Sequence, residues 1–386
     1  METIANKKNI ILMSMQVSDR IILMGKLWKS LNRTVILIYC NDSIVFTSLK
    51  NESFDVIIKA QSAEEILTIA AKINNSTFHY FNYGPDQLGY YLYSNKFEYI
   101  YDYKDLFRNI VHKTIADSSL DIEMEIIKNS IAITRRDNQI FYYLKMNYID
   151  YSLSKIAYVP GYFNSDIEYE KKIISNLSNQ NVNSPIKIVM SGGYLSENDP
   201  QLVLYEGISH LVKQFADTGI QIDLIGNFSS SLSAEASIFP LLTDLIDKKI
   251  VNILPMLTSE EFDDILLNYD FAMHMFNFDV KKSDYTIQFE NSNLLDYGGS
   301  ARIYSFIKAN LPIILGKSLP HIKEVLQGSG FSIEYHDEHK SNMFNILNNY
   351  KALNYKKEIY QYRNNFNDKT AIINFKKNIN EIGINF

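Results

Sequence analysis

Cysteine is almost absent from the 386-residue sequence, in which Cys40 is the single example. One cysteine inside an apolar run cannot build a disulfide framework or a cysteine-based metal cluster. Long apolar runs are lacking too: the N-terminal patch in "METIANKKNIILMSMQV" is too short for a secretory signal or a membrane-spanning helix. We therefore expect a protein of a reducing, cytoplasmic setting that is neither secreted through such a signal nor integral to a membrane.

Several sequence signatures of catalysis are also missing. No G-x-G-x-x-G follows the first expected strand, and neither H-E-x-x-H nor G-x-S-x-G occurs. The letters "LGKS" at 315–318 match the end of a phosphate-binding P-loop, but Leu311 stands where that motif needs glycine. Asp-x-Asp is absent as well, so we expect a chemistry that needs no metal ion and no other cofactor.

The sequence has fewer positive than negative side chains. It contains 38 Lys and Arg against 44 Asp and Glu, which gives a net charge of −6. Binding to the phosphate backbone needs a basic surface, so we expect no nucleic-acid partner. Two local basic clusters fall near expected helices: Arg20, Lys26, Lys29 and Arg33, and Arg108, His112 and Lys113. They are either solvated helix faces or a groove for an anionic acceptor, with peripheral contact at the inner face of a membrane as a further alternative.

Strand-like and helix-like patterns alternate along the whole sequence, which is typical of parallel, doubly wound α/β sheets. Apolar runs such as "TVILIYC" and "IQIDLIGN" have strand length, whereas "DRIILMGKLWKSL" is apolar at helical spacing. Ser62 with Glu65 and Thr258 with Glu261 have the spacing of capping boxes at helix starts. The pattern restarts after a junction at 164–184 and predicts two α/β halves, whose ligand is expected between them at the carboxyl ends of the strands.

The segment "GGSARIYSFIKANLPIILG", 298–316, is the strongest candidate for a ligand site. Gly298 and Gly299 would let a ligand approach a helix start, where backbone N–H groups lack partners, and Ser300 adds a hydroxyl. Arg302 supplies a fixed positive charge that can grip two phosphate oxygens without a metal. The segment fits a diphosphate, and a plain helix cap is the alternative.

Three more places carry candidate side chains or backbone groups. Gly192 and Gly193 are expected at a strand exit, where they would admit phosphate or sugar oxygens or simply lead into a loop. His274 stands in an apolar strand and is either a ligand contact or a core residue. Lys104 and Asp105 follow Asp102 at another strand end, where they can face the cleft or form a turn in which Asp105 caps the next helix.

These stretches together resemble the glycosyltransferases of the GT-B fold, in particular the retaining, nucleotide-sugar-dependent bacterial enzymes. The segment "ARIYSFIKANLPII" is similar to a family stretch that ends in Pro and two aliphatic residues, and "YIYDYKDLF" is similar to its Tyr-Asp-x-basic-Asp element. The resemblance implies two facing Rossmann-like domains with a cleft between them. It places the acceptor-side domain at 1–165, the nucleotide-sugar donor domain at 166–365 and a helical tail at 366–386.

The resemblance also implies roles for the candidate residues. Asp105, Lys104 and Arg302 would be catalytic, with Arg302 facing the donor diphosphate. The expected donor contacts are Gly192, Gly193, His274, Glu290, Gly298, Gly299, Ser300 and Ser305.

The sequence departs from the family pattern at the carboxylates that hold the nucleotide. Ser305 replaces the family's ribose-binding carboxylate, and Tyr297 stands in place of its companion, for which Glu290 or Asp296 would substitute. A basic pair after the first donor-domain strand is also missing. The resemblance implies sugar transfer from a nucleotide sugar to a glycan, lipid-linked or protein acceptor, with a catalytically degenerate binding subunit or a nucleotide-sugar epimerase as alternatives.

Overall fold

The structure is a computed structural model, and its chain forms two compact units. It describes residues 9–41, 52–82, 87–103, 117–146, 149–179, 181–195, 212–228, 242–255, 257–274, 300, 302–316, 319–336 and 342–382. Of these, the residues up to Tyr162 and those from Asp368 onward form the first unit, and the remainder, from Phe163 to Asn367, forms the second. Among the described residues, the chain thus leaves the first unit after Tyr162 and returns to it after Asn367.

The first unit is built on a seven-stranded, fully parallel sheet with the order β3-β2-β1-β4-β5-β6-β7. Its central strands read as continuous apolar runs because both faces of the sheet are covered by helices. The strands are β1 (Asn9–Gln16), β2 (Thr34–Asn41), β3 (Val56–Lys59), β4 (Ser76–Phe81), β5 (Tyr99–Asp102), β6 (Ala132–Arg135) and β7 (Ile156–Tyr158).

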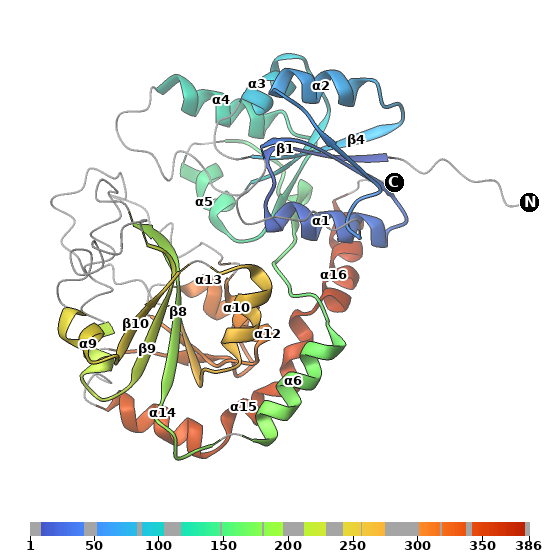
Figure 1. The fold of residues 1–386 in the computed structure, drawn as a ribbon. Coiled ribbons are helices and arrows are strands. Elements are labelled where there is room, and N and C mark those ends of the chain that lie inside the picture. The colour runs from blue at the N-terminus through green and yellow to red at the C-terminus, as the bar shows by residue number, and fades with distance from the viewer. Residues whose placement is uncertain are drawn as a thin grey trace, which may run out of the picture. The chain divides into compact units, whose positions relative to one another are not determined.

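Alternate residues of these strands enter two separate cores. Ile11 and Met13 belong to the core under α2, α3, α4 and α5, whereas Ile10 and Leu12 belong to the core under α1 and α16 (Asp368–Glu381). Figure 1 shows α2, α3 and α4 on one side of β1 and β4, and α1 on the other. The helices are α1 (Asp19–Ser30), α2 (Ala63–Ala71), α3 (Gln87–Ser94), α4 (Asp117–Lys128) and α5 (Gln139–Met146), and a 3-10 turn, η2 (Leu153–Lys155), precedes β7.

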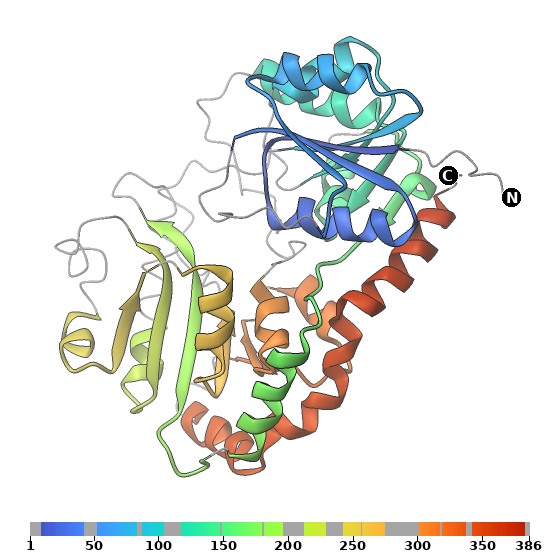
Figure 2. The same ribbon diagram turned by 45° about the vertical axis from the view of Figure 1, so that its right-hand side comes forward.

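The last helix, α16 (Asp368–Glu381), returns to the first unit and lies beside α1 (Figures 1 and 2). Phe375 packs edge-on against Trp28 of α1 with ring centroids 5.0 Å apart, and Ile379 enters the same core. Asn378 donates a hydrogen bond to the carbonyl of Tyr158 in β7. The tail predicted from residue 366 onward therefore contains a helix that completes one core of the first unit.

The second unit repeats this plan with a six-stranded parallel sheet in the order β10-β9-β8-β11-β12-β13. In both sheets the first strand of the unit lies inside the sheet, with its next two strands on one side and the later strands on the other. Both sheets therefore reverse their winding direction beside their first strand. The strands are β8 (Lys187–Leu195), β9 (Gln221–Phe228), β10 (Val251–Leu254), β11 (Phe271–His274), β12 (Ile313–Leu315) and β13 (Ser332–Glu334).

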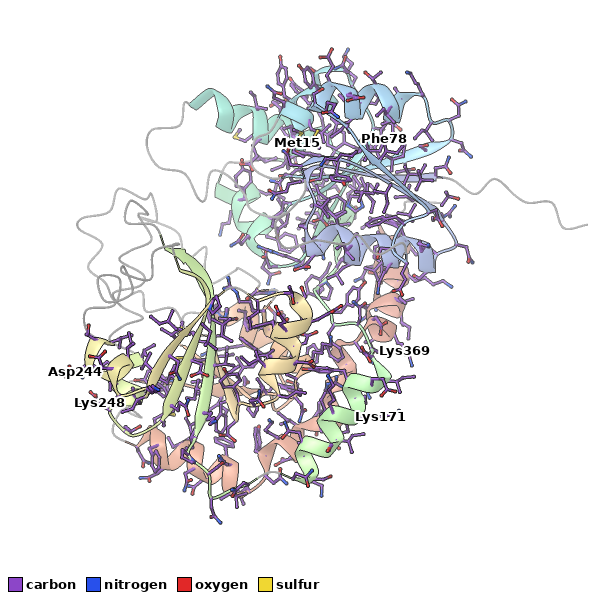
Figure 3. The ribbon with its side chains drawn as sticks, viewed as in Figure 1. Met15, Phe78, Lys171, Asp244, Lys248 and Lys369 are labelled. Carbon is purple, nitrogen blue, oxygen red and sulfur yellow. The ribbon has the colours of Figure 1, made fainter. Side chains whose placement is uncertain are left out.

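Helices again cover both faces of the second sheet. One core lies under α9, α14 and residues 212–216, and the other under α10, α12, α13 and α15. Figure 3 shows side chains filling the spaces between the sheets and their helices. The helices are α6 (Ile167–Ser178), α9 (Thr243–Asp247), α10 (Ser259–Leu266), α12 (Arg302–Lys308), α13 (Pro320–Leu326), α14 (Met343–Ala352) and α15 (Tyr355–Ile359), followed by η6 (Tyr360–Phe366).

The local signals in the sequence explain where these helices begin. Ser62 accepts a hydrogen bond from the backbone of Glu65 at the start of α2. Thr258 and Glu261 form the predicted reciprocal capping box of α10.

Lys351 ties α14 to the amino edge of the second sheet. Its ammonium group, which is buried, donates to the carbonyl and hydroxyl of Ser184 at 2.9 Å each, to the carbonyl of Pro185 at 3.2 Å and to the Asp270 carboxylate at 2.9 Å. A buried charge needs such a full set of partners because burying it unpaired costs several kcal/mol. The opposite, carboxyl edge of the sheet is left for the functional site.

We predict that Phe375→Ala destabilises the first unit by about 3–5 kcal/mol, because it leaves a cavity against Trp28. The effect is measured by denaturant unfolding, followed by the fluorescence of Trp28, which is the only tryptophan in the sequence. Ile373→Ala on the same helix is the matched control, since Ile373 is 69% exposed and should cost little. Equal effects of the two substitutions would show that α16 does not complete this core.

Candidate functional site

The candidate site lies at the carboxyl edge of the second sheet, between β8 and β11. Within the described residues, the two strands pair as far as Met190 and Met273. β8 continues to Leu195 beside β9, and its register is irregular between Ser191 and Tyr194. This is the point at which the winding direction of the sheet reverses, where open α/β sheets bind their ligands.

Gly192 and Gly193 lie within this extension of β8, at the irregularity, and not in a loop after the strand. The sequence predicts a strand exit at these glycines because they end the apolar run. The difference arises because β9 runs on to Phe228 and supplies hydrogen-bond partners for β8 beyond the rest of the sheet. Glycines at a strand irregularity favour the close approach of a ligand or another backbone.

Ser191 and His274 project to the same face of the sheet at this edge. Side chains alternate along a strand, so Ser191 shares the face of Val189, and His274 shares the face of Ala272. Val189 and Ala272 both belong to the core under α12. The two polar side chains therefore follow apolar ones toward α12, on neighbouring strands.

Arg302 begins α12 and lies near enough to His274 to act on its charge state. Burial, with a smaller contribution from the positive charge of Arg302, lowers the pKa of His274 to about 3. The imidazole is therefore neutral at physiological pH, and Arg302 supplies the positive charge. Of the other predicted donor contacts, Ser300 lies just before α12 and Ser305 one turn along it, and both are half-buried.

Ser191 is the site residue that the sequence analysis missed. The residue is only 8% exposed, and its hydroxyl oxygen has no hydrogen-bond partner in the part of the chain that the structure describes. The available signal in the sequence was a hydroxyl residue between a buried apolar run and two glycines. That signal is weak, because serine is common where strands end.

Five predicted site residues lie outside the described residues: Lys104, Asp105, Glu290, Gly298 and Gly299. The same holds for Asp296 and Tyr297. Their roles stay predictions. The structure brings together Arg302, His274, Ser300 and the glycines of β8 on one edge of the second unit.

Asp102, which precedes Lys104 and Asp105, is buried at the carboxyl edge of the first sheet. Arg20 grips both of its oxygens, with Nε at 3.2 and 3.1 Å and Nη2 at 2.8 Å. Arg20 also donates to the carbonyl of Val159 and so connects the start of α1 with the residue after β7. Asp102 is thus a structural anchor within the first unit.

A chain of hydrogen bonds leads from Asp102 to the core. Trp28 Nε1 can only donate, so it fixes Nδ1 of His79 as an acceptor at 3.0 Å. His79 then donates from Nε2 to Thr134 Oγ1 at 3.0 Å, and Thr134 donates to Asp102 at 2.6 Å. Burial lowers the pKa of His79 to about 3, although the Asp102 carboxylate opposes the shift.

Most side chains of the first basic cluster form ion pairs within the first unit. Arg20 is bound to Asp102, Lys26 pairs with Glu52, and Lys29 pairs with Asp55. The structure therefore favours a helix face whose charges pair locally over a groove for an anionic acceptor. The second cluster, Arg108, His112 and Lys113, lies outside the described residues.

The described ranges contain neither a metal-binding cluster nor a membrane-spanning helix. No group of three or more His, Cys, Asp or Glu side chains in those ranges is arranged to hold a metal ion. None of the described helices has the length and apolarity needed to cross a membrane. The metal-independent chemistry stays a prediction.

Comparisons with solved structures identify the fold. HepE from Anabaena in complex with UDP-glucose matches with a TM-score of 0.63 and 10% identity, over 96% of this chain and 99% of that chain. A glycosyltransferase from Rickettsia africae matches with a TM-score of 0.62 and 14% identity, over 98% and 100% of the two chains. Trehalose-6-phosphate synthase from Burkholderia multivorans matches with a TM-score of 0.58 and 9% identity, over 98% and 99%.

No family model and no curated protein matches the sequence. The solved structures, together with the two parallel sheets, confirm the predicted α/β architecture and show that the chain has the GT-B fold of glycosyltransferases.

We predict that the free energy of unfolding falls as the pH drops from about 6.5 toward 3, partly through His79. The ordinary histidine pKa of 6.5 is lowered to about 3 in the folded chain. Between these values the unfolded chain binds more protons, so acid favours unfolding. Unfolding free energies measured across this pH range should fall less steeply for His79→Gln. Glutamine can accept from Trp28 and donate to Thr134 but does not titrate; identical pH profiles would contradict the prediction.

Proposed function

We propose that the chain is a glycosyltransferase that moves a sugar from a nucleotide-sugar donor to a glycan, lipid-linked or protein acceptor. The observation that carries the proposal is the juxtaposition of Arg302 with neutral His274 at the carboxyl edge of the second sheet. In a GT-B fold, this edge is where a nucleotide is expected. The solved structures of HepE with UDP and with UDP-glucose make UDP the first nucleotide to test.

The chemistry follows from the charge at the site. Sugar transfer breaks the bond between the sugar and the diphosphate, and negative charge grows on the departing diphosphate oxygen. A fixed guanidinium stabilises that charge more in the transition state than in the bound donor, which accelerates the reaction. Arg302 can do this without a metal ion, and His274, being neutral, adds polar groups without a second charge.

For the acceptor, we propose only a chemical class. A bacterial cell-surface glycan made on the cytoplasmic side of a membrane fits the sequence analysis best. Peripheral membrane contact remains part of that proposal. A degenerate binding subunit and a nucleotide-sugar epimerase are distinguished by the experiments that follow.

We expect one nucleoside diphosphate to raise the melting temperature selectively, because a ligand that binds only the folded state stabilises it by mass action. The test is a thermal-shift panel of UDP, GDP, dTDP, ADP and CMP and their common sugar conjugates. A ligand at 100 times its dissociation constant adds about 2.7 kcal/mol. No shift with any of them would contradict nucleotide-sugar binding.

We further expect Arg302→Ala to lower turnover of the sugar conjugate of that nucleotide by about 100-fold, the loss typical of removing one well-placed stabilising group. Turnover is measured as nucleotide release with and without an acceptor extract. Lys171→Ala is the matched control, because Lys171 projects from α6 as an exposed side chain (Figure 3). Donor binding without nucleotide release in the wild type would indicate the degenerate subunit, and conversion of the donor to an isomer would indicate the epimerase.

A further inference from the structure

Ser191 is an apparent mismatch with its surroundings in the second unit. Its strand neighbour on the same face is Val189, and its partner across the sheet on β9 is Ile225, and both are buried and apolar. A buried hydroxyl without a hydrogen bond is less stable than an apolar side chain of similar size. Alanine or valine would continue this face without that cost, so the position calls for an explanation other than packing.

The place of Ser191 provides one. It follows Met190, the last residue of β8 that pairs with β11 in the described residues, and it is followed at once by the strand irregularity at Gly192 and Gly193. Its side chain turns to the α12 face, which is also the face of His274. Ser191, which is more than nine-tenths buried, therefore lies beside His274 on this face, at the carboxyl edge of the sheet.

The charge at this edge of the sheet selects the ligand group. Arg302 contributes a positive charge that acts on His274, and His274 is buried. An anionic oxygen is attracted by this positive charge and can accept a hydrogen bond from the Ser191 hydroxyl, whereas a cationic group would be repelled and an apolar group would leave the hydroxyl without a partner. Phosphate oxygens of a nucleotide meet this requirement.

We infer that Ser191 is a ligand contact of this site, and that its hydroxyl donates a hydrogen bond to a phosphate oxygen of the bound nucleotide beside Arg302 and His274. The inference rests on the proposed function and adds a residue that determines specificity for the phosphate part of the donor. It explains why a hydroxyl is retained at a position that packing alone would give to an apolar residue.

Titration calorimetry with UDP tests the inference, with the full chain as wild type, Ser191→Ala and Ser329→Ala. Ser191→Ala should weaken UDP binding about 10-fold, the loss of one hydrogen bond to a charged group. It should leave binding of uridine, which has no phosphate, unchanged. Its melting temperature without ligand should be equal to or above that of the wild type, because no hydrogen bond is lost.

Ser329→Ala is the matched control because Ser329 is also a buried serine of the second unit, but its hydroxyl is used within the fold. It donates to the carbonyl of Leu326 at 2.6 Å and accepts from the backbone of Phe331 at 3.3 Å. Removing it should lower the melting temperature and leave UDP affinity unchanged. The two serines should thus show opposite patterns.

Each other outcome overturns a defined claim. Unchanged UDP affinity in Ser191→Ala, with wild-type binding intact, overturns the inference and leaves the proposed function standing. An equal loss for UDP and uridine moves Ser191 to the nucleoside and overturns the phosphate assignment. If the wild type binds neither UDP nor any other nucleotide of the panel, the proposed function and the inference fail together.

Discussion

Parallel strand pairing is the constraint on which the rest of the structure depends. Every strand in both sheets runs in the same direction, so each connection must cross a face of the sheet, and helices or turns cover both faces. The carboxyl ends of all strands consequently meet on one edge. Where the winding direction reverses, next to the first strand of each unit, the connections leave the sheet toward opposite faces, so polar groups can gather at that edge.

The two units use this edge differently. In the first unit, Asp102 is gripped by Arg20 and joined through Thr134 to a histidine that burial keeps neutral. All of these groups have partners, so the network stabilises the unit and fixes the start of α1. In the second unit, Ser191, His274 and Arg302 gather at the carboxyl edge beside β8 and β11. The network around Asp102 is a structural anchor, whereas the buried hydroxyl of Ser191, on the same sheet face as His274, fits a ligand contact.

Much of the fold was predictable from the sequence because its signals are local. Apolar runs of strand length, helical spacing in the segment of α1 and the capping pair Thr258 and Glu261 each report on a few neighbouring residues. Their alternation over the chain indicated two parallel α/β sheets. The place of the C-terminal helix was not readable in the same way, because α16 reaches Trp28 of α1 across nearly the whole chain.

For the candidate site too, the local features were predictable from the sequence and the long-range contacts were not. The sequence by itself determined that glycines, a serine and an arginine stand near strand and helix ends, and that His274 lies in an apolar strand. Only the tertiary structure decided that β8 pairs with β11, that Gly192 and Gly193 lie inside an extended strand, and that Ser191 faces the same side as His274. The physical reason is that strand order and the length of the neighbouring strand are set by hydrogen bonds between segments far apart in the chain. The periodicity of one segment does not reveal these hydrogen bonds.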